Sequence, residues 1–192
     1  MGTANRVLRY IEGTFDYGIA YEKGKEARLI GYYGSDWSGS EDDMRSTSGY
    51  AFNLGSSVFS WALVKQSSVA LCIAEAEYVN ATEAIAQAIW LRFVLSDFGE
   101  EQVGATTILC DNTSAIAIAK NPVHHHKTRH INRKFHFIRD ALQNGEIDLL
   151  YCKTEEQTAD IFTKALPRDR FEYLRRKLGV ISAKHLEGSV EI

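Results

Sequence analysis

Long apolar runs are missing from this 192-residue sequence, and none approaches the roughly 20 residues that a membrane-spanning helix needs. The first residues also lack the uninterrupted apolar core of a secretion signal, so we expect an intracellular protein that is not secreted and has no membrane partner. Only three cysteines occur, at wide spacing, which argues against a zinc cluster and favours buried, reduced thiols. Repeats and low-complexity tracts are absent, and the length suits one domain with a short appendage.

A large net charge is lacking too, since the formal value is −3, and this argues weakly against a nucleic-acid partner. The distribution is uneven: residues 35–119 hold 3 Lys/Arg and 11 Asp/Glu, whereas residues 120–180 hold 13 and 8. An acidic region would concentrate divalent cations, and a basic region would contact phosphates. Ordinary solvated surface is the alternative interpretation of both regions.

The hydrophobic pattern predicts an α/β protein with a mixed sheet whose early strands are antiparallel. Strands are expected at 17–22, 28–35, 48–54, 57–64, 106–110 and 146–152. Helices are expected at 3–12, 73–98, 112–121, 128–143, 154–166 and 169–178. Gly55-Ser56 should form a tight turn between two strands, Gly99 should end the longest helix, and Thr154 should be the N-cap of the helix that follows it.

Four carboxylates stand at or within these predicted elements, namely Asp36, Glu77, Asp111 and Asp160. Asp36 and Asp111 each follow a strand, although the first is alternatively a turn residue and the second a helix cap. Asp160 is alternatively an exposed helix acid. If the four converge, an all-oxygen ligand set without Cys or His suits Mg²⁺ or Mn²⁺. Two such ions can activate water and stabilise the leaving oxygen of a phosphodiester.

Glu77 has the strongest case, because it shares a helix face with an apolar, Ala-rich stripe. The stripe members lie within about 40° of Glu77 on a helical wheel; they are Ile73, Ala81, Ala84, Ala88, Leu91 and Leu95. A carboxylate on a packing face is costly unless a cation or hydrogen-bond donors meet it. Glu75 points about 160° away, so Glu77 is the better functional candidate. An edge position that still reaches solvent is the alternative.

A basic helix is predicted at 128–143, and the residues before and within it suggest contacts with phosphates. The candidate nucleic-acid-binding residues are His126, Lys127, Arg129, His130 and Arg133. A solvated helix face is one alternative. A zinc site at His126 and His130, which are spaced i, i+4, is a weaker one, because no third ligand fits and the surrounding cations oppose a metal ion.

Four long segments together resemble one family: "STSGYAFNLGSSVFSW", "AEAEYVNATEAIAQAIWL", "CDNTSAIAIAKNPVHHHKTRHINRKFHFIRD" and "TADIFTKALPRDRFEYLRRKLGV". They are similar to the ribonuclease H domain at the C-terminus of copia-type LTR retrotransposon Pol polyproteins. The segment "ANRVLRYIEGTFDYGIAYEKG" looks like the tail of the preceding reverse transcriptase region. The resemblance divides the chain into a connection at 1–27, an RNase H-like domain at 28–180 and a C-terminal tail at 181–192.

The resemblance implies an RNase H fold, with a five-stranded mixed sheet whose first three strands are antiparallel and which helices flank. It further implies two-metal, Mg²⁺- or Mn²⁺-dependent hydrolysis of the RNA strand of RNA–DNA hybrids. The reverse transcriptase region of the same polyprotein becomes a possible partner. The expected location is intracellular, either cytoplasmic in a virus-like particle or nuclear. The family's metal-binding acids carry over to Glu77, Asp111 and Asp160.

Asp36 fits this family imperfectly. The family motif reads Y-S-D-A-D-W or Y-T-D-A-D-W, and its first Asp is the expected metal ligand. Aligned on Trp37, that position is Gly34, and Asp36 matches the second Asp. The two positions are about 6–7 Å apart along a strand, too far for Asp36 to replace the missing ligand at Mg–O distances of about 2.0–2.1 Å. Asp36 is therefore at best an imperfect fourth catalytic and metal-binding residue.

Three functions compete at this point. The first is a working or weakened RNase H. The second is a catalytically dead module that still binds nucleic acid. The third is a different nuclease or integrase on the same fold, which the matched motifs disfavour. The residue at position 34 separates the first two.

Overall fold

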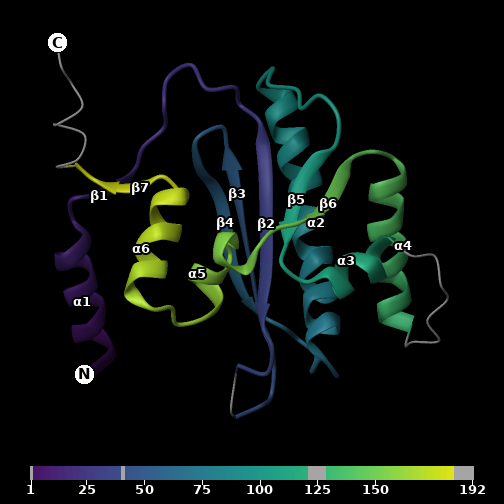
Figure 1. Ribbon diagram of the computed structural model, residues 1–192, viewed down its shortest axis with the longest axis horizontal. Helices are drawn as coiled ribbons and strands as arrows, with labels where there is room; N and C mark the ends of the chain where they lie inside the picture. The colour runs from purple at the N-terminus through teal and green to yellow at the C-terminus, as the bar shows by residue number, and fades with distance from the viewer. Residues whose placement is uncertain (1, 40–41, 121–128, 184–192) are drawn as a thin grey trace.

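The computed structural model describes residues 2–39, 42–120 and 129–183. Its central sheet has the strand order β4-β3-β2-β5-β6 (Figure 1). The strands are β2 Leu29–Asp36, β3 Thr47–Leu54, β4 Ser57–Lys65, β5 Thr106–Cys110 and β6 Ile147–Tyr151. Adjacent strands among β2, β3 and β4 are antiparallel, whereas β5 pairs parallel to both β2 and β6. The predicted five-stranded mixed sheet is therefore confirmed.

Helices cover both faces of this sheet (Figure 1). One face carries three helices, α2 Ile73–Asp97, α3 Thr113–Lys120 and α4 Arg129–Gln143. The other carries the short helices η1 Thr154–Glu156 and α5 Asp160–Thr163, followed by α6 Arg168–Lys177. In the described residues, no helix is both long and apolar enough to cross a membrane.

A second, two-stranded sheet joins segments that are far apart in the sequence. β1 Tyr17–Ile19, which follows the helix α1 Gly2–Thr14, pairs antiparallel with β7 Val180–Ser182. The amide of Ala183 also donates to the carbonyl of Asp16 at 2.7 Å. The predicted strand at 17–22 is thus shorter than expected and lies outside the central sheet, because its hydrogen-bond partner is the end of the described chain.

The Ala-rich stripe of α2 packs against the sheet as predicted, with one exception. Ala81, Ala84, Ala88, Leu91 and Leu95 are buried, and small side chains let α2 lie close to β2 and β3. Ile73 is instead 51% exposed, because it is the first residue of the helix and lies beyond the sheet contact. Glu75 is buried as well, but its side chain turns back to accept a hydrogen bond from the amide of Leu71 at 2.8 Å.

The single capped helix predicted at 154–166 is wrong. The structure has the 3₁₀ turn η1 and the separate one-turn helix α5, and Lys153 rather than Thr154 is the residue before η1. The break falls at Gln157, whose fully buried amide donates to the carbonyl of Tyr33 on β2 at 2.9 Å. This cross-contact holds Gln157 in an extended conformation, and α5 starts anew at Asp160 directly against the sheet.

Candidate active site

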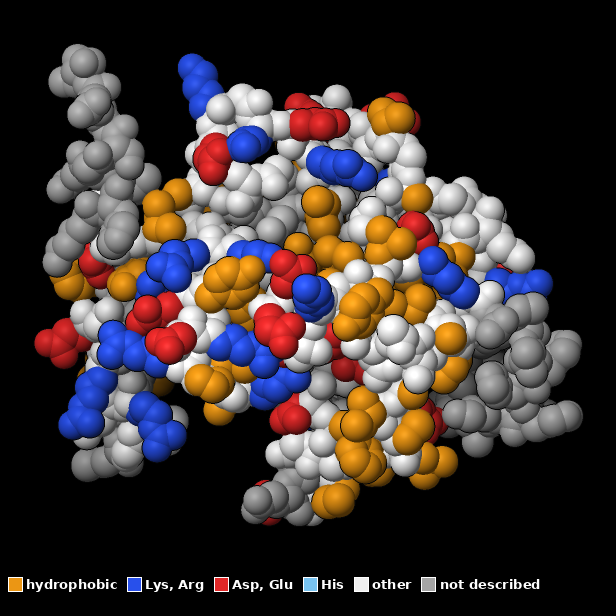
Figure 2. Space-filling view, in the orientation of Figure 1, with side chains coloured by type: hydrophobic (Ala, Val, Ile, Leu, Met, Phe, Trp, Pro, Cys, Tyr) orange, Lys and Arg blue, Asp and Glu red, His pale blue; other side chains and the backbone are white. Residues whose placement is uncertain are grey.

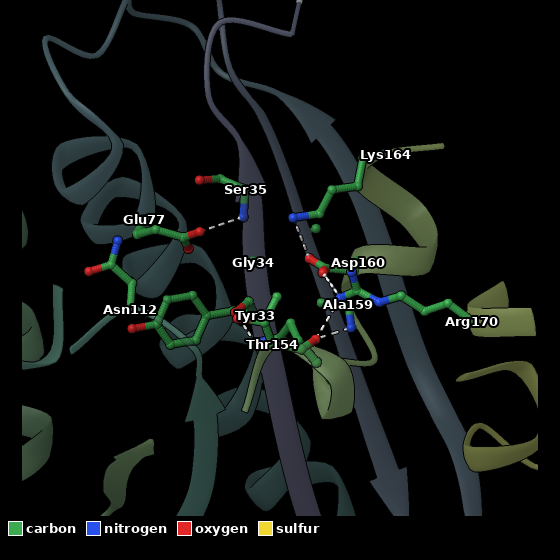
Figure 3. Close-up of polar contacts among 12 residues, drawn as sticks. Tyr33, Gly34, Ser35, Glu77, Asn112, Thr154, Ala159, Asp160, Lys164 and Arg170 are labelled. Atoms are coloured by element: carbon green, nitrogen blue, oxygen red, sulfur yellow. Dashed lines mark hydrogen bonds and ion pairs between the residues drawn. The ribbon is translucent and has the colours of Figure 1, made fainter. Parts of the chain in front are cut away.

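The candidate site lies around the last residues of β2, between α2 and α5 (Figure 3). Gly34 on β2 pairs with Gly49 on β3, and the buried Asn80 of α2 donates to both of their carbonyls, at 2.6 and 3.1 Å. A Cβ at Gly49 would come within 2.5 Å of Cγ2 of Thr163. The glycine at 49 therefore allows α5 to lie directly on the strands.

Glu77 reaches this region from α2 and is only 4% exposed. Its Oε1 accepts a hydrogen bond from the backbone amide of Ser35 at 2.9 Å, whereas its Oε2 is buried without a hydrogen-bond partner (Figure 3). Burial raises the pKa of Glu77 to about 7; the Ser35 amide opposes this shift, and the negative charge of Asp111 adds to it. The helical-wheel inference that Glu77 occupies a packing face is confirmed.

Asp111 follows β5 and does not cap the next helix. Asn112 does so instead, because its Oδ1 accepts a hydrogen bond from the amide of Ala115 at 3.0 Å. The carboxylate of Asp111 is left to line a cleft together with Asp36, Glu77 and Lys164.

Asp36 is the last residue of β2, where the chain turns away from the sheet. Its Oδ2 lies where a Cβ at Gly39 would sit, so the carboxylate folds against the following turn while it also lines the cleft. Asp36 thus lies next to the turn and also on the lining of the cleft, and its role as a metal ligand stays a prediction.

Asp160 is 1% exposed and lies on the other side of β2 from Glu77 (Figure 3). Two cations pair with it: Nζ of Lys164 lies 2.9 Å from Oδ1, and Nη2 of Arg170 lies 2.6 Å from Oδ2. Arg170 also donates to the carbonyl of Thr154 at 2.5 Å. Burial raises the pKa of Asp160, and Lys164 opposes this shift. The expectation of an exposed helix acid is therefore excluded.

Position 34 faces Asp160 directly. A Cβ built on Gly34 would lie 3.4 Å from Oδ1 of Asp160 and 3.6 Å from Cγ of Gln157. An aspartate there would place a second carboxylate beside Asp160, whereas Gly34 places none.

The residues present do not fit a two-metal centre. Within the described ranges, no group of three or more His, Cys, Asp or Glu side chains is arranged to hold a metal ion. Both oxygens of Asp160 already pair with cations, and position 34 supplies no ligand. The buried Oε2 of Glu77, which has no hydrogen-bond partner, would accept a cation.

The predicted nucleic-acid-binding residues are only partly placed. His126 and Lys127 lie outside the described residues. Arg129, His130 and Arg133 belong to α4, whose backbone is described but whose side chains at these positions are not. Their contact with phosphates stays a prediction.

Sequence reasoning missed the residues that surround the four carboxylates. Lys164 was detectable in principle, because Asp160 and Lys164 have the i, i+4 spacing of helical ion pairs. Arg170 comes from another helix, α6, in which basic and acidic residues are interspersed, so no local pattern marks this arginine (Figure 2). The side-chain amides of Asn80 and Gln157, which fix β2, are equally invisible without the fold.

Solved structures identify the class of fold. The N-terminal RNase H domain of rv2228c from Mycobacterium tuberculosis, determined as a fusion with maltose binding protein, superposes with a TM-score of 0.52. The two chains are 11% identical, and the match covers 78% of this chain and 97% of the other. This chain therefore has the RNase H fold. No protein-family model matches it.

Sequence relatives narrow the identification. The chain is 38% identical over 96% of its length to the retrovirus-related Pol polyprotein from transposon RE2 of Arabidopsis thaliana. It is 35% identical over 92% of its length to the corresponding polyprotein from transposon TNT 1-94 of Nicotiana tabacum. It spans 13% of the length of each relative. The chain is an RNase H-like domain homologous to part of the Pol polyproteins of copia-type retrotransposons.

Proposed function

We propose that this domain hydrolyses the RNA strand of RNA–DNA hybrids at a rate strongly impaired by glycine at position 34. The observation that carries the proposal is the direct approach of position 34 to Asp160. A carboxylate at 34 would complete an acidic site with Asp160, Glu77 and Asp111, and the present residue supplies none. The fold and the polyprotein relatives support the substrate class.

Divalent cations, when held by oxygen ligands, supply activated water and offset charge on the leaving oxygen. Because the present residues do not fit a complete two-metal centre, we propose that dependence on Mg²⁺ or Mn²⁺ is weak in the chain as it stands and strong in a form of the domain in which position 34 bears a carboxylate. In the chain as it stands, Glu77 and Asp111 keep the cleft acidic, and Lys164 and Arg170 neutralise Asp160.

Binding of the hybrid belongs to the same proposal. Residues 126–127 and the basic start of α4 would contact phosphates, and residues 28–180 would form the functional unit, with the preceding segment connecting it to a reverse transcriptase region. The domain would act inside the cell, in a cytoplasmic particle or in the nucleus.

The ion pairs of Asp160 favour a second candidate, a domain that binds the hybrid and does not cut it. Under this alternative, the domain would retain salt-dependent affinity for the hybrid without any turnover.

Gly34→Asp tests the proposal, with Gly34→Asn as a control of nearly the same shape and no charge. We expect Gly34→Asp to cleave a labelled RNA–DNA hybrid at least about tenfold faster than wild type in Mg²⁺, a difference of about 1.4 kcal/mol in activation free energy. Gly34→Asn should stay at the wild-type rate. Equal rates for wild type and Gly34→Asp would overturn the role of position 34, and binding without cleavage by either would establish the second candidate.

A further inference from the structure

The cleft at the end of β2 already contains a positive charge. Lys164 lines it together with Asp36, Glu77 and Asp111, and its Nζ lies 2.9 Å from Oδ1 of Asp160 (Figure 3). The ammonium thus stands between the acids that line the cleft and the buried acid behind them.

The backbone fixes the position of this lysine. Lys164 is the C-cap residue directly after α5; its φ and ψ of −144° and 156° are extended, and its amide still donates to the carbonyl of Asp160 at 3.2 Å. The side chain starts one helical turn from its carboxylate partner and is 35% exposed, so it is reachable from the cleft. Holding a lysine side chain in one rotamer costs conformational entropy, which a pair with an exposed acid would hardly offset. The pair with the buried carboxylate of Asp160 offsets more of this cost.

Arg170 closes the other side of the same carboxylate. Its guanidinium donates to Oδ2 of Asp160 and to the carbonyl of Thr154. Since Lys164 pairs with Oδ1, both carboxylate oxygens of Asp160 have a cationic partner. On the opposite side of β2 from Asp160, Oε2 of Glu77 is buried and has no hydrogen-bond partner (Figure 3). The site therefore holds a buried acceptor without a partner, and a divalent cation that entered the cleft would have to displace Lys164 or be repelled by it.

We propose that the Lys164 ammonium is the resident cation of this cleft and that it weakens the binding of divalent cations by the carboxylates around it. The inference shares its site with the proposed function but makes a separate claim about cation binding. It explains why acidic residues converge here in an arrangement that does not suit a metal ion.

Titration of the intact chain with Mn²⁺ alone, in the absence of nucleic acid, tests this inference. By calorimetry, we expect Lys164→Gln to bind Mn²⁺ at least about tenfold more tightly than wild type, because a positive charge a few ångströms away is removed. Lys164→Arg keeps the charge and should match wild type. Lys120→Gln is the matched control, since Lys120 also pairs with an aspartate, Asp148 at 3.0 Å, but on the exposed surface.

Circular dichroism checks that each variant is folded, and Lys164→Met provides a second neutral side chain if Lys164→Gln is not. Mn²⁺ binding by the folded neutral variant that is no tighter than by wild type would overturn the inference. Equal tightening in Lys164→Arg would overturn it as well. Because hydrolysis is not measured, these outcomes are independent of whether Gly34→Asp restores cleavage.

Discussion

Glu77 and Asp160 are both nearly inaccessible carboxylates that flank the same strand, yet their surroundings are opposite (Figure 3). Glu77 has one backbone hydrogen bond, a neighbouring negative charge at Asp111 and an unpartnered oxygen. Asp160 has an ammonium on one oxygen and a guanidinium on the other. One acid is buried without an ion pair and feels Lys164 only at a longer range, and the other is buried within an ion-pair network.

The difference shows what each acid contributes to the fold. A buried charge without a counter-charge favours its protonated form and lowers the stability of the folded state when ionised. A buried charge with two cations is compensated, although burial still raises the pKa of Asp160, and removal of the charge would leave Lys164 and Arg170 without a counter-charge. Asp160 is thus connected by ion pairs to Lys164 and to Arg170 of α6, whereas Glu77 has no such ion pair, and burial of its charge lowers the stability of the folded state.

Asp160→Asn should have the largest effect, because it leaves Lys164 and Arg170 beside a neutral side chain. We expect a loss of about 2–3 kcal/mol in the free energy of unfolding, below the full value for buried pairs since both cations are partly exposed. Urea unfolding measures it. Lys120→Ala, which breaks the exposed pair with Asp148, is the control and should cost less than about 0.5 kcal/mol. Similar losses in both variants would remove the distinction between the two kinds of pair.

Glu77→Gln should change how stability depends on pH. The pKa of Glu77 is raised to about 7 in the folded state, so the stability that its protonation gives is present in acid and is lost as pH rises through 7. Relative to Glu77→Gln, the wild-type free energy of unfolding should therefore fall by about 2–3 kcal/mol between about pH 5 and about pH 8. Parallel stability curves for the two proteins would show that Glu77 titrates normally.

The two paired glycines should respond differently to an added methyl group. Gly49→Ala places a Cβ within 2.5 Å of Thr163 and should destabilise the fold by about 1–2 kcal/mol as α5 shifts. Gly34→Ala meets its nearest atom, Oδ1 of Asp160, at 3.4 Å, so it should be neutral within about 0.5 kcal/mol. Thermal unfolding of both variants makes the comparison. A larger loss at position 34 would mean that it has no room for the aspartate that we propose to introduce.

Much of the fold follows from local pattern, and the errors fall where distant contacts dominate. The sequence predicts the strands from alternating apolar residues, the turn at Gly55-Ser56, and the Ala-rich packing face of α2. Each of these depends only on neighbours in the sequence or on one helix face. The sequence does not predict the break at Gln157 or the short strand β1, because each depends on a partner more than a hundred residues away. These partners are Tyr33 for Gln157 and β7 for β1.

The site divides in the same way. Glu77 could be chosen over Glu75 from helix geometry alone, and the structure places its carboxylate against β2. Asp111 does not cap α3 because the side chain of its neighbour Asn112 does so. The ion pair of Asp160 with Arg170 depends on a residue from another helix, α6. Sequence could name the acids, but the cations that compensate them become evident only in three dimensions.

The small β1–β7 sheet also has a mechanical consequence. In its antiparallel register, Tyr17 lies opposite Ser182 and Ile19 opposite Val180, so the outer ends of both strands lie together. Tension applied at Asp16 and Ala183 would load the hydrogen bonds one after another, as a zip opens, instead of shearing them all at once. The ladder would therefore yield under a small force, and the five-stranded sheet would bear load only after it had opened.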